Sequence, residues 1–565
     1  MQTERKKPIA AFMAFGTKGD VYPIAAIAAA FASDQRQYDV FLITHSAHEN
    51  LSFRLAAKYV TFYPISSSPV LCASDNHNRT ESGSLELTFE QKKRETTREH
   101  RKECYSAVVK IFGDGPSLEG DFIAINFFAL EGWSLAELFR VRCLVAAPYV
   151  VPYSAPASFE YCFTKEHPLL YKYLKEAPIN KVCWGDVIHW MWPLFTENWG
   201  SWRSEELNLC ACPFTDPVTG LPTWYDRASS PKLFTTTDYW PSSVRVCGFW
   251  FLPNSWQYSC KQCGELSAFL LDANNRLCAS HIGMQAFMDA ANSTPPIFVG
   301  LSSVARQNPE AFLRVLQTVL HTTTYRFVLF TAGYEPLDTA IRVMAPGTSS
   351  VLTQRVITQY GISIFDGKLF CFSGMVPYKY LFPRCLAAIH HGGSGSTAAA
   401  LHAGIPQILC PFMLDQFYWA ERMFWLGVAP EPLKRNHLVP DNADETSIKE
   451  AAEALSQAIQ YALSPRVKEC AKEIAERISV ESEQWVHSWN RLHNLHLPLE
   501  VVMMYNDGDP RSMICPLMKH YYYQLYTTSS LIDHTYDEYG SWNSTLDCPI
   551  NKLLLLSRPD PESIR

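Results

Sequence analysis

The chain has 565 residues, 47% of them hydrophobic, which is enough for two or three domains of about 100–200 residues each. A formal net charge of −7 argues against a nucleic-acid-binding face, because such faces are basic. The sequence contains no run of about 20 apolar residues and no signal-peptide pattern, so we expect no transmembrane helix and a cytoplasmic protein whose 17 cysteines, an odd number, are reduced.

The first 150 residues alternate between apolar strands and helices. The expected strands are residues 8–15, 38–44, 121–127 and 143–147, and the expected helices are residues 21–31 and 47–59. Residues 66–102 are polar and charged, which predicts a loop followed by a helix. This alternation is typical of a doubly wound α/β domain with a parallel sheet.

Asp20 follows the first expected strand, in a turn that begins at Gly16. An aspartate directly before a helix is a favoured N-cap, which is the simpler interpretation. A carboxylate at the carboxyl end of a parallel strand can also act as a general base for an attacking hydroxyl. Spacing alone leaves both interpretations open. The turn lacks the third glycine of G-x-G-x-x-G, which argues against a dinucleotide-binding loop.

Residues 150–256 are rich in tryptophan, tyrosine and proline and follow no simple helical pattern. One interpretation is an irregular insertion with an aromatic core. The other is an apolar acceptor pocket or a face that contacts a membrane surface. The candidates for such a wall are Trp184, Trp190, Trp192 and Phe195.

Two cysteine pairs raise the question of zinc. One residue separates Cys210 from Cys212, and two residues separate Cys260 from Cys263. Neither spacing fits a standard zinc module, so we expect no metal site.

The stretch from Cys385 to Gly427 is the most informative part of the sequence. An apolar strand leads into His390, His391 and a glycine-rich turn, and an alanine-rich helix follows that ends at Gly404. The N-terminus of such a helix presents unpaired N–H groups and the positive end of the helix dipole, which suit a phosphate. A tight turn that binds nothing is the alternative.

Asp415 and Gln416 follow the next expected strand, residues 407–410, and so share a sheet edge with His390. A carboxylate and a carboxamide can hold several sugar hydroxyls by directional hydrogen bonds. A phosphate-binding turn beside such a pair predicts a nucleotide-sugar site.

These motifs resemble a known family. HHGGSGST at 390–397, AGIP at 403–406 and the Asp415–Gln416 pair resemble the donor-site signature of UDP-sugar glycosyltransferases of the sterol 3-β-glucosyltransferase branch. Residues 15–23 resemble the GTRGDVQP motif of that branch, and residues 167–253 resemble its plant-type subgroup. The resemblance implies a GT-B fold, in which two doubly wound Rossmann-like domains face a cleft. It also implies inverting transfer of a hexose, with glucose expected, from a UDP-sugar to an apolar, sterol-like acceptor.

The resemblance implies the role of each candidate residue. Asp20 would be the general base, and Asp415 and Gln416 would hold the donor sugar. His390 would stabilise the departing diphosphate together with the N–H groups of the turn. The turn residues are Gly392, Gly393, Ser394, Gly395 and Ser396.

Two further donor contacts are implied. Ser303 would approach the phosphates from a GLSS turn where the family has GFGS, and the backbone of Val376 would meet the uracil ring. We expect no cofactor and no metal, since the helix dipole and a histidine supply the positive field. The expected partners are a UDP-sugar and an apolar hydroxylated small molecule or lipid, with peripheral membrane contact as an option.

The resemblance also sets the expected domain limits. They are an acceptor-binding domain at 1–253 with the insertion at 150–253, a linker at 254–264, a nucleotide-sugar-binding domain at 265–465, a helix crossing back to the first domain at 466–499, and a tail of unknown role at 500–565. Two other hypotheses stay open. One is a non-catalytic GT-B scaffold that binds a lipid or a nucleotide sugar as a sensor, and the other is a nucleotide-dependent oxidoreductase.

Overall fold

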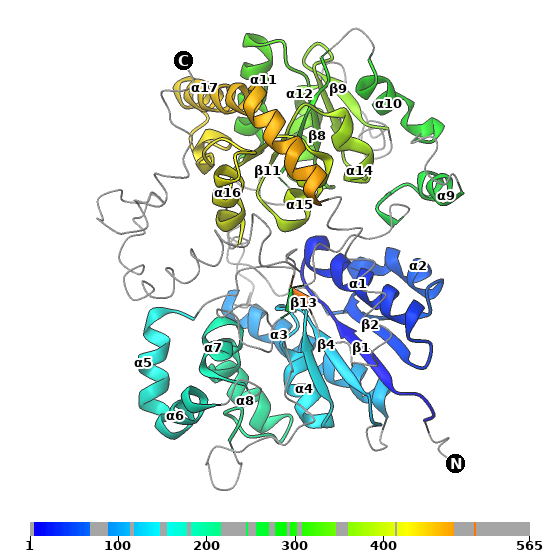
Figure 1. The fold of residues 1–565 in the computed structure, drawn as a ribbon, viewed down its shortest axis with the longest axis vertical. Helices are drawn as coiled ribbons and strands as arrows, with labels where there is room; N and C mark the ends of the chain where they lie inside the picture. The colour runs from blue at the N-terminus through cyan, green and yellow to red at the C-terminus, as the bar shows by residue number, and fades with distance from the viewer. Residues whose placement is uncertain are drawn as a thin grey trace, which may run out of the picture. The chain divides into compact units, whose positions relative to one another are not determined.

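The structure is a computed structural model, shown as a ribbon in Figure 1. It describes residues 5–67, 89–113, 118–146, 155–177, 182–215, 245–246, 256–269, 277–290, 294–301, 308–345, 360–412, 415–478 and 502–503. The chain divides into two compact units. They are Met1–Phe251 with Pro498–Leu553, and Leu252–Leu497 with Leu554–Arg565.

Among the described residues, the first unit contains a five-stranded parallel sheet in the order β3-β2-β1-β4-β5. The strands are β1 (Ile9–Met13), β2 (Asp39–His45), β3 (Val60–Ile65), β4 (Phe122–Ile125) and β5 (Arg142–Val145). The strand order reverses between β1 and β4, and ligands of such sheets bind outside the carboxyl ends of the strands at this switch point. The predicted doubly wound half is present, with β3 in addition to the expected strands.

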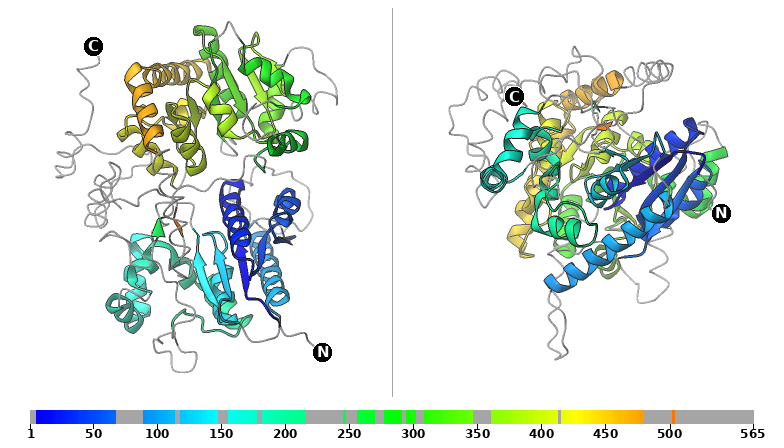
Figure 2. Two further views of the ribbon diagram at one scale, coloured as in Figure 1. Left: turned by 45° about the vertical axis from the view of Figure 1, so that its right-hand side comes forward. Right: turned by 90° about the horizontal axis from the view of Figure 1, so that it is seen from below.

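Helices cover both faces of this sheet, as Figures 1 and 2 show. They are α1 (Lys18–Asp34), η1 (Ser46–Leu51), α2 (Ser52–Ala56), α3 (Phe89–Phe112) and α4 (Glu131–Phe139). Alternate residues of β1 face opposite ways, because side chains alternate along a strand. Ile9 and Met13 belong to the core that also holds residues of α3 and α4, whereas Phe12 packs edge-on against Phe31 of α1, with centroids 6.0 Å apart.

The aromatic-rich insertion is largely helical over the described part of 157–205, which corrects the interpretation of it as irregular structure. Its helices are α5 (Ala157–Glu166), α6 (Pro168–Glu176), α7 (Trp184–Asp186), η3 (Val187–Met191), η4 (Trp192–Phe195) and α8 (Glu197–Glu205). Pro168 opens α6 and Pro193 lies in the first turn of η4. Proline is tolerated at a helix start, so here the prolines mark starts of short helices instead of excluding them.

The second unit contains a six-stranded sheet in the order β12-β11-β7-β8-β10-β9 among the residues described there. The strands are β7 (Ile297–Gly300), β8 (Phe327–Phe330), β9 (Ile362–Ile364), β10 (Leu369–Phe372), β11 (Ala388–His390) and β12 (Gln407–Leu409). All pairs are parallel except β9 with β10. The switch point lies between β7 and β11, directly before His391 and the glycine turn.

Two helical layers flank this sheet. The longer helices are α9 (Lys261–Phe269), α10 (Ile282–Met288), α11 (Pro309–Thr322), α12 (Glu335–Met344), α15 (Ser394–Ala403), α16 (Gln416–Trp425), α17 (Glu445–Ala462) and residues 465–478, and the shorter ones are η6 (Ala279–His281), α14 (Tyr378–Leu381), η8 (Phe382–Arg384) and η9 (Arg435–His437). Ile297 and Val299 of β7 pack with α11, α12 and α17. Phe298 faces the other layer, with residues of α10, α14 and α15.

The segment predicted as a linker, 254–264, packs into this second layer where it is described. Trp256, Tyr258 and Cys263 are buried, and α9 begins at Lys261. The segment contains polar residues, which suggested a linker, but its side chains Tyr258 and Cys263 belong to the core of this layer.

Outside the two main sheets, β6 (Arg245–Val246) pairs in parallel with β13 (Val502–Met503). This pairing joins one part of the predicted tail to the first unit. The helix expected at 466–499 is present over 465–478, and the residues that follow, up to 501, lie outside the described part. None of the helices described is long and apolar enough to cross a membrane.

Candidate donor and acceptor sites

The turn after β1 places Asp20 in the first turn of α1. Thr17 is the N-cap of α1, so Asp20 is the third helical residue, which excludes the N-cap interpretation. Its carboxylate accepts the N–H and the hydroxyl of Thr17, each at 2.7 Å. Gly16 has φ +108°, and a Cβ there would lie 2.7 Å from Asp20 Oδ2. The turn therefore requires glycine and orients the carboxylate.

Asn126, which follows β4 at the first switch point, braces this turn. Its amide nitrogen donates to the carbonyl oxygens of Phe15 and Asp20 at 2.8 and 3.3 Å, and its oxygen accepts the N–H of Phe15 at 3.2 Å. The side chain is fully buried. Asn126 was not among the predicted residues. Its place directly after a buried strand is the signal that could have identified it.

Three histidines that were not predicted lie around the same edge. His48 contacts the Gly16 carbonyl oxygen at 3.2 Å, and His45 and His100 each pack against the Phe15 ring, with centroids 4.9 and 4.5 Å apart. Burial lowers the pKa of His45 and that of His100 to about 4. Both rings are therefore neutral at neutral pH and add no positive charge beside Asp20.

His390 is buried and fully engaged within the second unit. Its Nδ1 accepts the N–H of Gly392 at 3.1 Å, so Nε2 carries the proton and donates to Gln407 Oε1 at 2.9 Å. Burial lowers the pKa of His390 to about 3, so the ring is neutral. In this arrangement the imidazole anchors the glycine turn, and neither ring nitrogen points a donor at a ligand.

His391 differs from its neighbour. Its ring forms a hydrogen bond with the backbone of Gly300 at the end of β7, across the second switch point. Burial lowers the pKa of His391 to about 4. Its Nδ1 is buried without a hydrogen-bond partner among the described residues. A Cβ at Gly393 would lie 2.5 Å from His391 Nε2, so the turn leaves room for this ring.

The glycine turn leads into α15, whose N-cap is Gly393. Gly392 has φ +85°, and a Cβ there would lie 2.9 Å from the Gln416 carbonyl oxygen. The first N–H groups of a helix, here those of Ser394, Gly395 and Ser396, have no partner within the helix. A Cβ at Gly395 would meet no atom of the described residues within 4 Å, so their packing does not require glycine there and they leave the space beside this helix start open.

Asp415 and Gln416 lie at the start of α16, against the glycine turn. Asp415 is the N-cap, and its Oδ2 accepts the indole N–H of Trp419 at 3.1 Å. Gln416 Oε1 accepts the N–H of Phe412 at 3.0 Å. The predicted hydroxyl-binding pair is thus held by its own loop and helix, next to Gly392.

Val376 lies in the turn between β10 and α14, in the same unit. Tyr378, two residues on, contacts the Ser396 hydroxyl at 3.2 Å, which links this turn to the start of α15. The structure therefore gathers Val376, the glycine turn and the Asp415–Gln416 pair at one edge of the second sheet. Ser303 lies outside the described residues.

The candidate acceptor wall is only partly described. Trp184 is buried within the first unit's core and stacks on Phe159, with centroids 6.1 Å apart. Phe195 is half-buried against the same core, Trp192 is half-buried against Phe159, and the side chain of Trp190 lies outside the described part. For Trp184, burial favours the aromatic-core interpretation over an open pocket wall.

Comparison with known proteins gives the chain's relatives. The family described as "Erythromycin biosynthesis protein CIII-like, C-terminal domain" matches residues 370–478. Two sterol 3-beta-glucosyltransferases of Arabidopsis thaliana are 23% and 25% identical to this chain, over 87% and 86% of it and 68% and 64% of their own lengths. A sterol 3-beta-glucosyltransferase of Debaryomyces hansenii is 23% identical over 83% of this chain and 26% of that protein. The chain spans about two thirds of the plant relatives and about a quarter of the other.

Among solved structures, the calicheamicin glycosyltransferase CalG4 aligns with 86% of this chain and 99% of its own, at 16% identity and a TM-score of 0.45. Two doubly wound sheets, each with a helix starting at its switch point, define an α/β protein with two Rossmann-like units. The chain is a relative of the sterol 3-beta-glucosyltransferases, which confirms the resemblance predicted from its motifs.

Proposed function

We propose that the protein is an inverting glycosyltransferase that moves a hexose, with glucose as the first candidate, from a UDP-sugar to a hydroxyl of an apolar, sterol-like acceptor. The observation that supports this most directly is the start of α15, where helix N–H groups adjoin the open space at Gly395 and the Asp415–Gln416 pair. The names of the relatives supply the class of acceptor and the sugar.

In the proposed donor complex, the N–H groups of Ser394, Gly395 and Ser396 bind the diphosphate and stabilise the charge that develops as it departs. His390 has a positioning role, because its hydrogen bonds hold the turn from behind. The predicted direct contact between His390 and the diphosphate is replaced in this proposal by that support. Asp415 and Gln416 hold the sugar hydroxyls.

Contacts to the uracil ring and to the phosphates complete the proposed donor complex. The Val376 backbone meets the uracil ring, and Ser303 approaches the phosphates. No metal or cofactor takes part in the transfer, since helix N–H groups supply the positive field. This part of the proposal can be tested by running the transfer with and without added Mg²⁺ or Mn²⁺, where the rate should be unchanged.

In the proposed transfer, Asp20 accepts the proton of the acceptor hydroxyl. The acceptor oxygen forms a bond to the anomeric carbon from the face opposite the diphosphate, and the bond from that carbon to the phosphate oxygen breaks to release UDP. The hydrogen bonds from Thr17 orient the carboxylate for this task without a large rearrangement.

Membrane contact, where a sterol-like acceptor would be met, is proposed for the insertion. Tyr161 on α5 and Leu169 on α6 are 74% and 59% exposed. Aromatic and aliphatic side chains at a surface can enter a lipid interface. Sedimentation with sterol-containing vesicles should fall in a Tyr161→Ser, Leu169→Ser variant and stay unchanged in Phe53→Ser, which alters an exposed residue on α2.

The test of the proposed function is a screen of UDP-sugars against sterols and other apolar alcohols, with mass-spectrometric detection of products. The expected result is a product heavier than its acceptor by one hexose, formed together with UDP. Binding of UDP-sugar without any product across the screen would favour the non-catalytic scaffold. Retention of a nicotinamide nucleotide in place of UDP would favour the oxidoreductase.

A further inference from the structure

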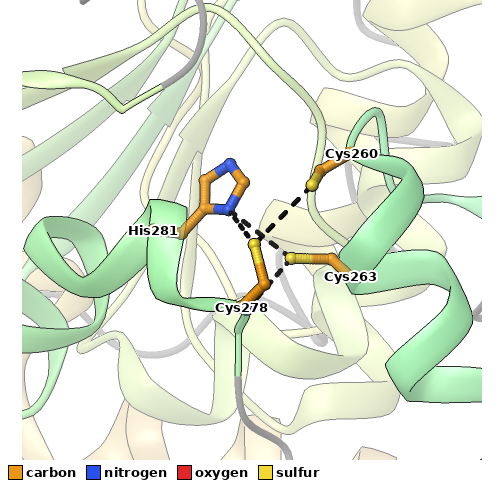
Figure 3. A group of neighbouring side chains, drawn as sticks. All are labelled: Cys260, Cys263, Cys278 and His281. Carbon is orange, nitrogen blue, oxygen red and sulfur yellow. Dashed lines mark hydrogen bonds between the residues drawn. The ribbon is translucent and has the colours of Figure 1, made fainter.

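Four side chains with metal-binding atoms meet where α9 and η6 approach each other in the second unit (Figure 3). They are Cys260, Cys263, Cys278 and His281, and their ligand atoms all lie within 4.8 Å of one another. Cys263, Cys278 and His281 are buried, and Cys260 is half-buried. Figure 3 shows the three sulfurs and the His281 Nδ1 directed toward a common centre.

The separations match a tetrahedral zinc site. Zn–S bonds of about 2.3 Å and Zn–N bonds of about 2.0–2.1 Å place sulfurs about 3.8 Å apart and sulfur and nitrogen about 3.6 Å apart. Cys260 Sγ lies 3.7 Å from Cys278 Sγ. His281 Nδ1 lies 3.5 Å from Cys263 Sγ and 3.2 Å from Cys278 Sγ. Small adjustments would therefore bring all four atoms onto one ion.

The sequence pattern supports the same conclusion once the structure joins its two halves. Two residues separate Cys260 from Cys263, two separate Cys278 from His281, and 14 separate the two pairs. Paired ligands of this kind, set apart by a longer spacer, are typical of structural zinc modules with three cysteines and one histidine. Cys260 and Cys263, considered without their partners, fit no module, so their spacing alone does not indicate a metal.

The surroundings favour a metal over free thiols. Without a cation, three thiols and an imidazole share an apolar site with only weak mutual hydrogen bonds. The Cys278 N–H already points at Cys263 Sγ, at 3.3 Å, as amide groups do around metal-bound thiolates.

We propose that Cys260, Cys263, Cys278 and His281 bind one Zn²⁺ as a structural site. Binding displaces the three thiol protons, and the resulting thiolates and the neutral imidazole complete the tetrahedron. With all four positions filled by protein, the ion has no open position for a substrate. It ties the start of α9 to η6 and α10, on the face of the sheet that also packs α14 and α15.

A second consequence rests on the proposed function. Ser259, adjacent to Cys260, bonds the backbone of Met375: its N–H donates to the Met375 carbonyl at 3.0 Å, and its hydroxyl accepts the Met375 N–H at 2.8 Å. Met375 precedes Val376. The zinc site therefore holds the turn proposed to meet the uracil ring, and removal of the metal should weaken UDP binding.

The first test is the metal content of the full chain, purified under reducing conditions and without chelator, by elemental mass spectrometry. We expect one zinc per chain in the wild type and in Cys162→Ser, which changes an exposed cysteine on α5. We expect loss of zinc in Cys278→Ser and in His281→Gln. Wild-type protein with no more zinc than Cys278→Ser would overturn the proposal, whatever the transferase activity.

Thiol protection in the wild-type chain provides a second readout if the variants do not fold. Peptide mapping after alkylation should show Cys162 modified and Cys260, Cys263 and Cys278 protected until a chelator is added. Replacement of zinc by Co²⁺ should produce the visible absorption of a tetrahedral thiolate site. Rapid alkylation of all three cysteines without chelator, or a disulfide between Cys260 and Cys278, would contradict the site.

Discussion

At the scale of single residues, Asp20 is the proposed general base. Its carboxylate accepts hydrogen bonds from the backbone N–H and the hydroxyl of Thr17. Asp20→Asn keeps an oxygen that can accept from Thr17, so we expect a folded protein that binds UDP with unchanged affinity. Turnover should fall by about 10²–10⁴-fold, the usual contribution of a general base. Steady-state kinetics and calorimetry with UDP measure the two effects separately.

The matched control for Asp20 is Asp34→Asn, at the exposed end of the same helix. This change removes one carboxylate from α1 without touching the turn, so turnover should stay at the wild-type level. Equal activity of Asp20→Asn and Asp34→Asn would remove Asp20 from the reaction.

Gly392 and Gly395 lie three residues apart in one turn and are predicted to respond oppositely to alanine. Gly392→Ala puts a Cβ at positive φ and 2.9 Å from the Gln416 carbonyl oxygen, so stability should fall by about 1–3 kcal/mol. Gly395→Ala adds a better helix former in open space, so stability should rise or stay equal, by up to about 1 kcal/mol. Thermal unfolding of both variants measures this difference.

The functional part of the glycine prediction is UDP affinity. A methyl group at Gly395 would occupy space proposed for the diphosphate, so binding should weaken although the fold is intact. Undiminished UDP binding by a stable Gly395→Ala protein would argue that the diphosphate lies elsewhere.

Buried histidines predict an acid-labile fold. Burial lowers the pKa of His390 to about 3 and that of His391 to about 4, from an ordinary 6.5. As pH falls below 6.5, the unfolded chain takes up protons that the folded chain refuses, so stability is lost until the folded-state pKa is reached. Each such histidine can contribute up to about 1.4 kcal/mol per pH unit.

Urea unfolding at about pH 7.5 and 5.5 tests this pH dependence. His390→Gln should show a smaller loss of stability between the two pH values than the wild type. His321→Gln, at an exposed position on α11, should keep the wild-type loss. An identical loss in all three proteins would show that His390 is not the neutral, buried group described.

At the scale of elements, a buried ion pair fixes the insertion to the first sheet's helical layer. Arg203 on α8 is fully buried and donates two hydrogen bonds of 3.0 Å to the carboxylate of Glu137 on α4. It also donates to the Cys210 carbonyl at 2.9 Å. The pair therefore joins the insertion to α4 with defined geometry.

Truncation of this pair should be strongly destabilising. Arg203→Met removes two charge-assisted hydrogen bonds from the largely desolvated Glu137 carboxylate, at a cost of about 3–5 kcal/mol. Arg203→Lys should recover only part of that loss, because lysine cannot match the two-pronged geometry. Arg98→Met, on the exposed face of α3, is the control and should be near neutral. Chemical denaturation of the three variants measures their free energies of unfolding. An Arg203→Met protein as stable as Arg98→Met would contradict the prediction.

Elements with one strong local signal could be predicted from sequence. The apolar runs before Gly16 and His390 are strands, and the alanines after the glycine turn form α15, because these signals act within a few residues. The insertion was harder, since its helices are short and their aromatic side chains pack on several sides. The antiparallel strand β9 could not be predicted either, because three residues are too few to show an alternating apolar pattern.

Long-range partners limited prediction of the sites. His390 and Gln407 are 17 residues apart, and only the fold shows the hydrogen bond between them, which occupies the Nε2–H group of the imidazole. Cys260 and Cys278 are 18 residues apart, on either side of α9, so their shared centre appears only in three dimensions. The glycine turn and the Asp415–Gln416 pair, proposed to bind the donor, follow the neighbouring strands β11 and β12, which sequence order already indicates.

At the scale of the whole molecule, the proposed reaction divides between the two units. The first unit supplies Asp20 at the switch point of its sheet, and the second supplies the turn proposed to bind the donor, at the switch point of its own. Each site is built by local contacts within its unit, so each can be altered without unfolding the other.

Proton NMR of one reaction, with UDP-glucose and the acceptor found by screening, tests sugar transfer most directly. It follows donor, product and anomeric configuration together. We predict that a glucoside of inverted, β configuration appears as the donor disappears, at a rate that falls in Asp20→Asn. A product of retained configuration, or donor that is consumed only to free glucose with every acceptor, would contradict the proposed transfer.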